Sequence, residues 1–127
     1  MTTPRTKVGL IDDSKGSRRI VERLLTRNGY EVAVAEDGYL GMLMIRRDTP
    51  DVILLDIDMP AIDGLTLCRM LKANERYAKL PVVLLSSKNT EFDVADGAIA
   101  GADDYLTKPF TEDTVVKCLE KVLANGK

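Results

Sequence analysis

Side chains with reactive groups stand directly behind four short apolar runs in this sequence. The run at residues 7–11 leads into Asp12 and Asp13, and the run at residues 52–55 leads into Asp56. The run at residues 82–85 leads into Ser86, and the run at residues 105–106 is followed two positions later by Lys108. If the ends of these runs meet in space, three carboxylates, one hydroxyl and one ammonium group share a single site.

Such a group of side chains is suited to phosphoryl chemistry. Three carboxylates held a few ångströms apart repel one another, so the cluster either keeps protons or binds a hard cation. All-oxygen ligands suit Mg²⁺, which leaves coordination positions for phosphate oxygens. Lys108 can pair with a carboxylate at rest and with a phosphoryl oxygen after transfer, while the Ser86 hydroxyl donates a hydrogen bond to another oxygen.

The apolar runs have the composition of β-strands that are buried on both faces of a parallel sheet, because Val, Ile and Leu follow one another without alternation. A further strand is predicted at residues 31–35. Helices are predicted at residues 15–27, 64–74 and 91–100, from the Asp37-Gly38 start to the Thr49-Pro50 stop, and from a Thr111 cap to Ala124.

These elements form five βα units. Right-handed crossovers with helices on both faces predict a doubly wound α/β fold, flavodoxin-like, with five parallel strands in the order 2-1-3-4-5 and five helices. The first and third strands are neighbours in that order, and ligands of open α/β sheets bind where the order reverses. We therefore expect Asp12, Asp13 and Asp56 to meet there.

The spacing of apolar residues predicts which side of each helix faces the core. The inward positions are expected to be Ile20, Val21, Leu24 and Leu25 in the first helix, Leu40, Leu43 and Met44 in the second, Leu65, Cys68 and Leu71 in the third, and Val115, Leu119 and Val122 in the last. Cys68 and Cys118 lie on predicted helices rather than in a close pair, so we expect reduced packing residues.

Length and composition predict a soluble protein with a single domain, 1–127, and a core at about residues 7–124. Its 18 basic and 20 acidic residues give a formal net charge of -2 without a basic cluster, which argues against nucleic-acid binding. No apolar stretch approaches the roughly 20 residues that span a bilayer, and no secretory signal opens the chain, so we expect a cytoplasmic protein without membrane insertion. Histidine is absent, so histidine chemistry requires a partner.

Several motifs, in order along residues 8–123, resemble the receiver domain of bacterial two-component response regulators. They are Asp12-Asp13, Asp56 with Met59-Pro60 and Asp63-Gly64, Ser86, and Lys108-Pro109-Phe110. The resemblance implies that Asp56 accepts a phosphoryl group from the phosphohistidine of a partner histidine kinase. It also implies that Asp12, Asp13, Asp56 and the backbone carbonyl of Asp58 bind Mg²⁺, and that Lys108 contacts the phosphoryl group.

The resemblance further implies how the switch works. Ser86 and Tyr105 match the pair in which the hydroxyl moves toward the phosphate and the aromatic ring rotates inward. Asp58 and Lys88 match two positions that flank the path of water to the phosphoryl group, and we expect them to modulate its lifetime by pairing across the mouth of the cleft. The chain would then be a phosphoacceptor with only self-phosphorylation and self-dephosphorylation chemistry, and not an enzyme.

The segments at residues 85–88 and 105–110, together with Lys15, look most like stand-alone receivers of chemotaxis-like and twitching-motility pathways. Only three residues follow the last predicted helix, so we expect no output domain and signalling through protein contact. The resemblance places that contact, with a downstream motility or signalling protein, on the face formed by the fourth helix, fifth strand and fifth helix. We expect a monomer or weak dimer.

Two alternatives compete with this interpretation. A phosphatase of the haloacid-dehalogenase type would use Asp56-Ile57-Asp58 as its nucleophile motif, but Pro60 stands where that family has Thr or Val, and Asp12 and Asp13 precede the nucleophile instead of following it. A scaffold could keep the fold and work without phosphorylation, although the intact set of acids argues against it. Sustained turnover of phosphomonoesters would favour the first alternative.

Overall fold

Five parallel strands form one sheet in this computed structural model, which describes residues 5–87 and 100–125. The strands are β1 (Lys7–Ile11), β2 (Glu31–Ala35), β3 (Val52–Asp56), β4 (Val82–Ser86) and β5 (Asp104–Thr107). They lie in the order β2-β1-β3-β4-β5, and every neighbouring pair is parallel. This confirms the predicted flavodoxin-like sheet and makes β1 and β3 neighbours.

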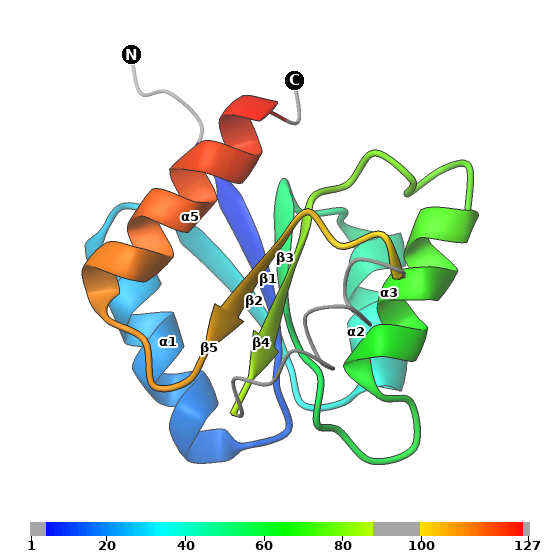
Figure 1. Cartoon of the computed structure of the whole chain (residues 1–127), viewed down its shortest axis with the longest axis horizontal. Coiled ribbons are helices and arrows are strands. Elements are labelled where there is room, and N and C mark those ends of the chain that lie inside the picture. Colours follow the sequence, from blue (N-terminus) through cyan, green and yellow to red (C-terminus); the bar gives the residue numbers. More distant parts are fainter. Residues whose placement is uncertain (1–4, 88–99, 126–127) are drawn as a thin grey trace.

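Helices cover both faces of the sheet (Figure 1). Helices α1 (Lys15–Arg27) and α5 (Glu112–Asn125) lie on one face, and α2 (Gly38–Arg47) and α3 (Gly64–Ala73) lie on the other. The predicted fourth helix falls almost entirely on residues 88–99, which lie outside the described residues. No helix in the described ranges is both long and apolar enough to cross a membrane.

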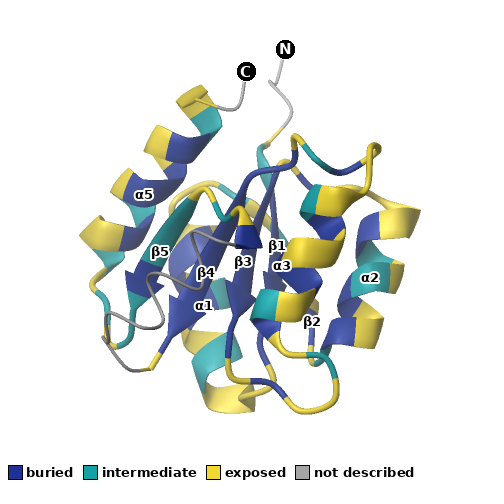
Figure 2. Ribbon diagram, turned by 45° about the vertical axis from the view of Figure 1, so that its right-hand side comes forward, coloured by how far each residue is buried: buried dark blue, intermediate teal, exposed yellow. Residues whose placement is uncertain are grey.

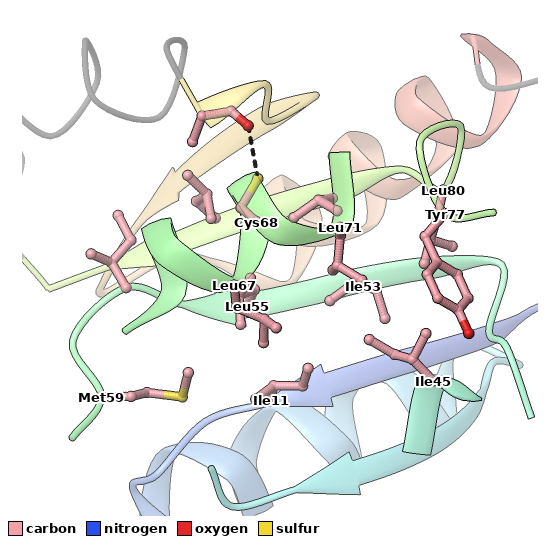
Figure 3. Packing of buried hydrophobic residues seen from close by; sticks show 14 of the residues in the cluster. Ile11, Ile45, Ile53, Leu55, Met59, Leu67, Cys68, Leu71, Tyr77 and Leu80 are labelled. Atoms are coloured by element: carbon pink, nitrogen blue, oxygen red, sulfur yellow. Dashed lines mark hydrogen bonds between the residues drawn. The ribbon is translucent and has the colours of Figure 1, made fainter. Parts of the chain in front are cut away.

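The strands contribute side chains to two separate cores, one on each face. In β3, Ile53 and Leu55 join the cluster under α2 and α3, while Val52 and Leu54 join the cluster under α1 and α5. Figure 2 shows β3 and β4 as buried throughout, and Figure 3 shows side chains of the α2–α3 cluster at close range. The prediction of strands buried on both faces is confirmed for β1, β3 and β4, whereas in β5 only Leu106 is buried.

Polar side chains fix where the helices begin, because each accepts a hydrogen bond from a backbone N–H of the first turn. The cap residues are Ser14, Asp37, Asp63 and Thr111. The predicted bounds of α1 and β2 are reproduced, α3 ends one residue earlier than predicted, and α5 extends to Asn125.

The predicted inward face of α2 is wrong for two of its three residues. Leu40 and Leu43 are 42% and 52% exposed, and the buried residues of this helix are Gly38, Gly41 and Ile45. A Cβ atom at Gly41 would lie 2.6 Å from Cδ1 of Ile11, so the missing side chain lets α2 pack closely on β1. A prediction based on the spacing of large apolar residues does not consider glycine, and it therefore assigns the wrong side of α2 to the core.

The predicted inward position of Ile20 is also wrong, since this side chain is 68% exposed. Val21, Leu24 and Leu25 fill the contact between α1 and the sheet. Ile20 instead lines a small cleft with Lys108 and other residues of the β5–α5 connection.

Candidate functional site

Carboxylates from two neighbouring strand ends form a cluster at the carboxyl edge of the sheet. Asp12 follows β1 and Asp56 ends β3, and these two strands pair in register up to Ile11 and Leu55. One carboxylate oxygen from each of Asp12, Asp13 and Asp56 lies within 4.8 Å of the other two. Asp12 is completely buried, Asp56 is nearly so, and Asp13 is exposed, so the cluster has a buried floor and an open rim.

Asp12 is held by several donors. Its Oδ1 accepts a hydrogen bond from the Ser14 N–H at 2.9 Å, and its Oδ2 accepts from the Ser17 hydroxyl at 2.8 Å and from Lys108 Nζ at 3.0 Å. Burial raises the pKa of Asp12, but these three donors outweigh it and bring the pKa below its ordinary value. Asp12 is therefore a buried, ionised carboxylate.

The carboxylate of Asp56 accepts fewer hydrogen bonds than that of Asp12. Its Oδ1 accepts one hydrogen bond from the Asp58 N–H at 3.2 Å, and Lys108 Nζ lies 4.0 Å from its Oδ2. Burial is the main cause that raises the pKa of Asp56 to about 7; Lys108 opposes the rise and the charge of Asp12 adds to it. A bound cation would favour the ionised form of this carboxyl.

Ser86 and Lys108 lie at the same edge of the sheet. Ser86 ends β4 and is buried, and its backbone carbonyl accepts a hydrogen bond from the Lys108 N–H at 2.6 Å. The peptide bond between Lys108 and Pro109 is cis. The structure therefore brings together the three carboxylates, the hydroxyl-bearing strand end and the ammonium group that are far apart in the sequence.

The backbone of Asp56 lies against the first residue of α3. A Cβ atom at Gly64 would lie 2.2 Å from the carbonyl oxygen of Asp56, which no side chain can tolerate. The Gly64 N–H donates to the Ile57 carbonyl at 3.0 Å. Glycine at this position therefore lets the β3–α3 connection close tightly behind the acid cluster.

The side chains of Asp58 and Tyr105 are not part of the acid cluster, although the Asp58 N–H donates to Asp56. Asp58 is exposed, and its Oδ2 accepts a hydrogen bond from the Ser87 hydroxyl at 3.2 Å, which links the segments that follow β3 and β4. Lys88, its predicted partner, lies outside the described residues. Tyr105 is half-buried on β5, in register with Leu84, and packs partly against the α2–α3 cluster.

The sequence predictions missed three contributors to the site. Ser17 donates to the Asp12 carboxylate, Arg18 Nη1 donates to the Asp12 backbone carbonyl at 2.8 Å, and Ser87 binds Asp58. Ser17 stands three residues after the cap Ser14, so the first turn of α1 folds back over the strand end. That spacing could have indicated Ser17; nothing in the sequence indicated Arg18.

The sequence pattern of the response regulator receiver domain matches residues 8–120. The chain belongs to this family. The carboxylate cluster, at the carboxyl edge of the sheet, is thus the acidic pocket of a receiver, and a receiver is a phosphoacceptor and not a turnover enzyme. The haloacid-dehalogenase alternative is excluded.

Individual relatives share most of this receiver's length. Protein PilG of Pseudomonas aeruginosa is 42% identical over 114 residues, which cover 90% of this chain and 84% of PilG. Protein PilH of the same organism is 36% identical over 118 residues, which cover 93% of this chain and 98% of PilH. The solved structure of the chemotaxis protein CheY4 of Vibrio cholerae superposes with a TM-score of 0.88 at 30% identity, covering 94% of this chain and 99% of CheY4.

Substitution of Gly64 tests the tight connection behind the receiver's acid cluster. Gly64→Ala should lower the free energy of unfolding by about 1–3 kcal/mol, because the new Cβ must displace backbone. Gly16→Ala in α1 is the matched control. Nothing lies within 4 Å of its Cβ position, so the higher helix propensity of alanine should raise the free energy of unfolding by roughly 0.5–1 kcal/mol. Urea unfolding measures both, and equal effects would contradict this packing.

The raised pKa of Asp56 predicts a pH effect on the metal-free receiver. Between about pH 4, the ordinary pKa of an unfolded Asp, and about 7, the folded protein keeps a proton that the unfolded chain has lost. This contribution to stability is complete below about pH 4 and is lost as the pH rises through 7.

The free energy of unfolding of the wild type should therefore fall by about 2.5 kcal/mol between roughly pH 5 and pH 8, nearly all of it below about pH 7, and Asp56→Asn should lack this fall. Urea titrations with a chelator present measure the difference. Asp113→Asn, which alters an exposed acid of α5, should show the same fall as the wild type. If the wild-type and Asp56→Asn curves ran parallel, Asp56 would have an ordinary pKa.

Proposed function

We propose that this receiver is a Mg²⁺-dependent signalling switch in which Asp56 accepts a phosphoryl group from the phosphohistidine of a partner kinase. One observation carries the proposal: Asp56 ends a central strand with carboxylate oxygens of Asp12 and Asp13 within 4.8 Å and the Lys108 ammonium 4.0 Å away. Asp12 shares these surroundings, but its two carboxylate oxygens already accept hydrogen bonds from Ser14, Ser17 and Lys108, so we assign the nucleophile to Asp56.

The residues present fit a magnesium ion. The donor set is all oxygen, its members come within 4.8 Å of one another, and Asp13 leaves the cluster open to solvent. Asp12, Asp13 and Asp56 would hold the ion together with the backbone carbonyl of Asp58. When bound, Mg²⁺ neutralises the carboxylates and stabilises negative charge on the phosphoryl oxygens.

The chain's own residues supply the rest of the transfer. A carboxylate oxygen of Asp56 forms the new O–P bond while the N–P bond of the phosphohistidine breaks, and the released electron pair stays on the imidazole, which takes up a proton. Lys108, now bound to Asp12 at 3.0 Å, is close enough to contact a phosphoryl oxygen on Asp56. This chain contains no histidine, so the donor is another protein.

Phosphorylation by a small donor tests this assignment. Acetyl phosphate with Mg²⁺ should add one phosphoryl group to the wild-type protein, as measured by intact mass. Asp56→Asn should abolish the addition, Asp13→Ala or an excess of chelator should prevent it, and Asp113→Asn should leave it unchanged. Persistent labelling of Asp56→Asn would place the nucleophile elsewhere, and no labelling of wild type would favour a scaffold without phosphorylation.

We propose that Ser86 and Tyr105 convert phosphorylation into a change of surface. Ser86 ends the strand beside β3, and Tyr105 lies on the neighbouring strand β5. The Ser86 hydroxyl would donate to the phosphoryl group, and the Tyr105 ring would turn inward. A phosphoryl group shifts this equilibrium only through contacts that differ between the two states.

Ser86→Ala separates phosphorylation from switching. The variant should accept a phosphoryl group from acetyl phosphate, but the aromatic NMR signals of Tyr105 should not shift as they do in wild type. Lys108→Arg should behave similarly, because a planar guanidinium does not replace a compact ammonium. A full shift of the Tyr105 signals in both variants would mean that another route couples the site to the surface.

We also propose that Asp58 obstructs hydrolysis of the phosphorylated form. Its hydrogen bond to Ser87 crosses from the segment after β3 to the segment after β4, beside the mouth of the acid cluster. Lys88, one residue further, was expected to pair with the same carboxylate. An exposed contact of this kind contributes at most about 1 kcal/mol, which corresponds to about fivefold in a rate.

Asp58→Ala should therefore speed the loss of phosphate from Asp56 by up to about fivefold. Ser87→Ala and Lys88→Ala should each have a smaller effect in the same direction, and each double mutant with Asp58→Ala should be little faster than Asp58→Ala alone. ³¹P NMR after removal of the donor measures the rates. Slower loss in Asp58→Ala would show instead that this carboxylate orients the attacking water.

For the pathway, we propose a chemotaxis-like or pilus-motility system, with a downstream protein bound at the face of β5, α5 and the predicted fourth helix. The similarity to the chemotaxis protein CheY4 supports this placement. Phosphotransfer to this receiver from a chemotaxis-type kinase should then be faster than transfer from a kinase that serves a transcriptional regulator. Faster transfer from the second kinase would contradict the proposed pathway.

A further inference from the structure

Helix α2 carries a second apolar stripe, of which only Met44 packs against the core. Leu40, Leu43 and Met44 are spaced as i, i+3 and i+4, and Arg47 continues the same row at i+7. Gly41 packs against Ile11 of β1, Gly38 packs against Ile62, and Ile45 is buried in the α2–α3 cluster. Both leucines are exposed, so this stripe is available to a second surface.

The stripe forms one wall of a groove of about 610 Å³ at the edge of the sheet. The groove runs beside the outermost strand β2, and Val34 and Arg18 belong to its lining. The described part of the chain has six exposed large apolar side chains, and three of them, Val34, Leu40 and Leu43, line this groove. An apolar concentration of this kind on a charged surface is typical of a protein-binding site.

The charges around the groove favour an acidic occupant. Two arginines, Arg18 and Arg47, and two acids, Glu36 and Asp48, line it. Asp48 is already neutralised by an ion pair with Lys7. Arg18 donates to the neutral backbone carbonyl of Asp12 and forms no ion pair among the described residues. Within residues 5–87 and 100–125, Arg47 has no ion-pair partner. Two guanidinium groups are therefore opposed by one available carboxylate, Glu36.

We propose that this groove binds an amphipathic helix of a partner protein, with its apolar face on Leu40 and Leu43 and its carboxylates facing Arg18 and Arg47. A stripe that spans positions i to i+7 is about 10 Å long, which matches two turns of a helix packed alongside α2. A second copy of this chain fits less well, because it would bring one arginine-rich groove against another.

The groove is far from the proposed output face, so the two surfaces can bind different partners. β2 and β5 are the two outer strands, so the groove and the face of β5 and α5 lie at opposite edges of the sheet. A partner in the groove can therefore be bound at the same time as a partner on the β5–α5 face. The receiver would be anchored through α2 while it signals through the other edge.

A defined peptide pair tests the proposal. The probe is a synthetic 18-residue amphipathic helix with Leu at i, i+3 and i+7 and Glu on the flanks, and the control peptide has Lys in place of every Glu. The Glu peptide should shift the backbone amide NMR signals of β2 and α2 and bind at least tenfold more tightly than the Lys peptide at low salt.

Surface variants identify the contacts. Leu43→Ser should weaken binding of the Glu peptide at least fivefold, and Arg47→Glu should reverse the preference so that the Lys peptide binds more tightly. Met70→Ser, which changes an exposed apolar residue of α3 outside the groove, should have no effect. All three variants should be phosphorylated by acetyl phosphate like wild type, so failure of this proposal is distinguishable from failure of the phosphorylation mechanism.

Three results would overturn the proposal. Equal binding of the two peptides would remove the role of the arginines, and signal shifts confined to the β5–α5 face would place the site elsewhere. A concentration-dependent dimer that Leu43→Ser abolishes, seen by analytical ultracentrifugation, would show that the groove belongs to a second copy of this chain.

Discussion

The burial of two neighbouring carboxyl groups, Asp12 and Asp56, at the carboxyl edge of the sheet is the constraint on which the rest of this structure depends. Asp12 and Asp56 are both buried, and one ammonium group, Lys108, lies closer to the first than to the second. The hydrogen-bond donors around Asp12 lower its pKa, whereas burial raises the pKa of Asp56 to about 7. The site is thereby prepared for a cation, and the acid that gains most from one is the proposed phosphoacceptor.

The fold maintains this arrangement through backbone contacts as much as through side chains. The strand order places β1 beside β3, Gly64 lets α3 begin against the carbonyl of Asp56, and the Lys108 N–H binds the carbonyl of Ser86. The groove beside β2 also depends on a close backbone approach, because Gly41 lets α2 pack on β1 while Leu40 and Leu43 stay exposed. In our proposals the chemistry takes place at the carboxyl ends of β1 and β3, signalling uses the β5 side of the sheet, and attachment uses the β2 side.

The sheet and the acid cluster could be predicted from the sequence, because buried parallel strands are continuous runs of Val, Ile and Leu and their polar ends must share an edge. The residues with which each helix contacts the core were harder to predict. Leu40, Leu43 and Ile20 were assigned to the core because they are apolar, but glycine at position 41 decided the rotation of α2. The Arg18 contact with a backbone carbonyl and the Ser87 contact with Asp58 depend on loop geometry that no spacing rule describes. Lys88 and most of the predicted fourth helix lie outside the described residues.

Calorimetry of Mg²⁺ binding tests the central claim most directly. In buffers of different ionisation enthalpy near pH 7, binding to the wild-type protein should release a substantial fraction of one proton, because the ion displaces the proton that burial keeps on Asp56. Asp56→Asn, which has no proton to lose, should release none. Tight binding of Mg²⁺ to wild type without proton release, or no binding at all, would contradict the account.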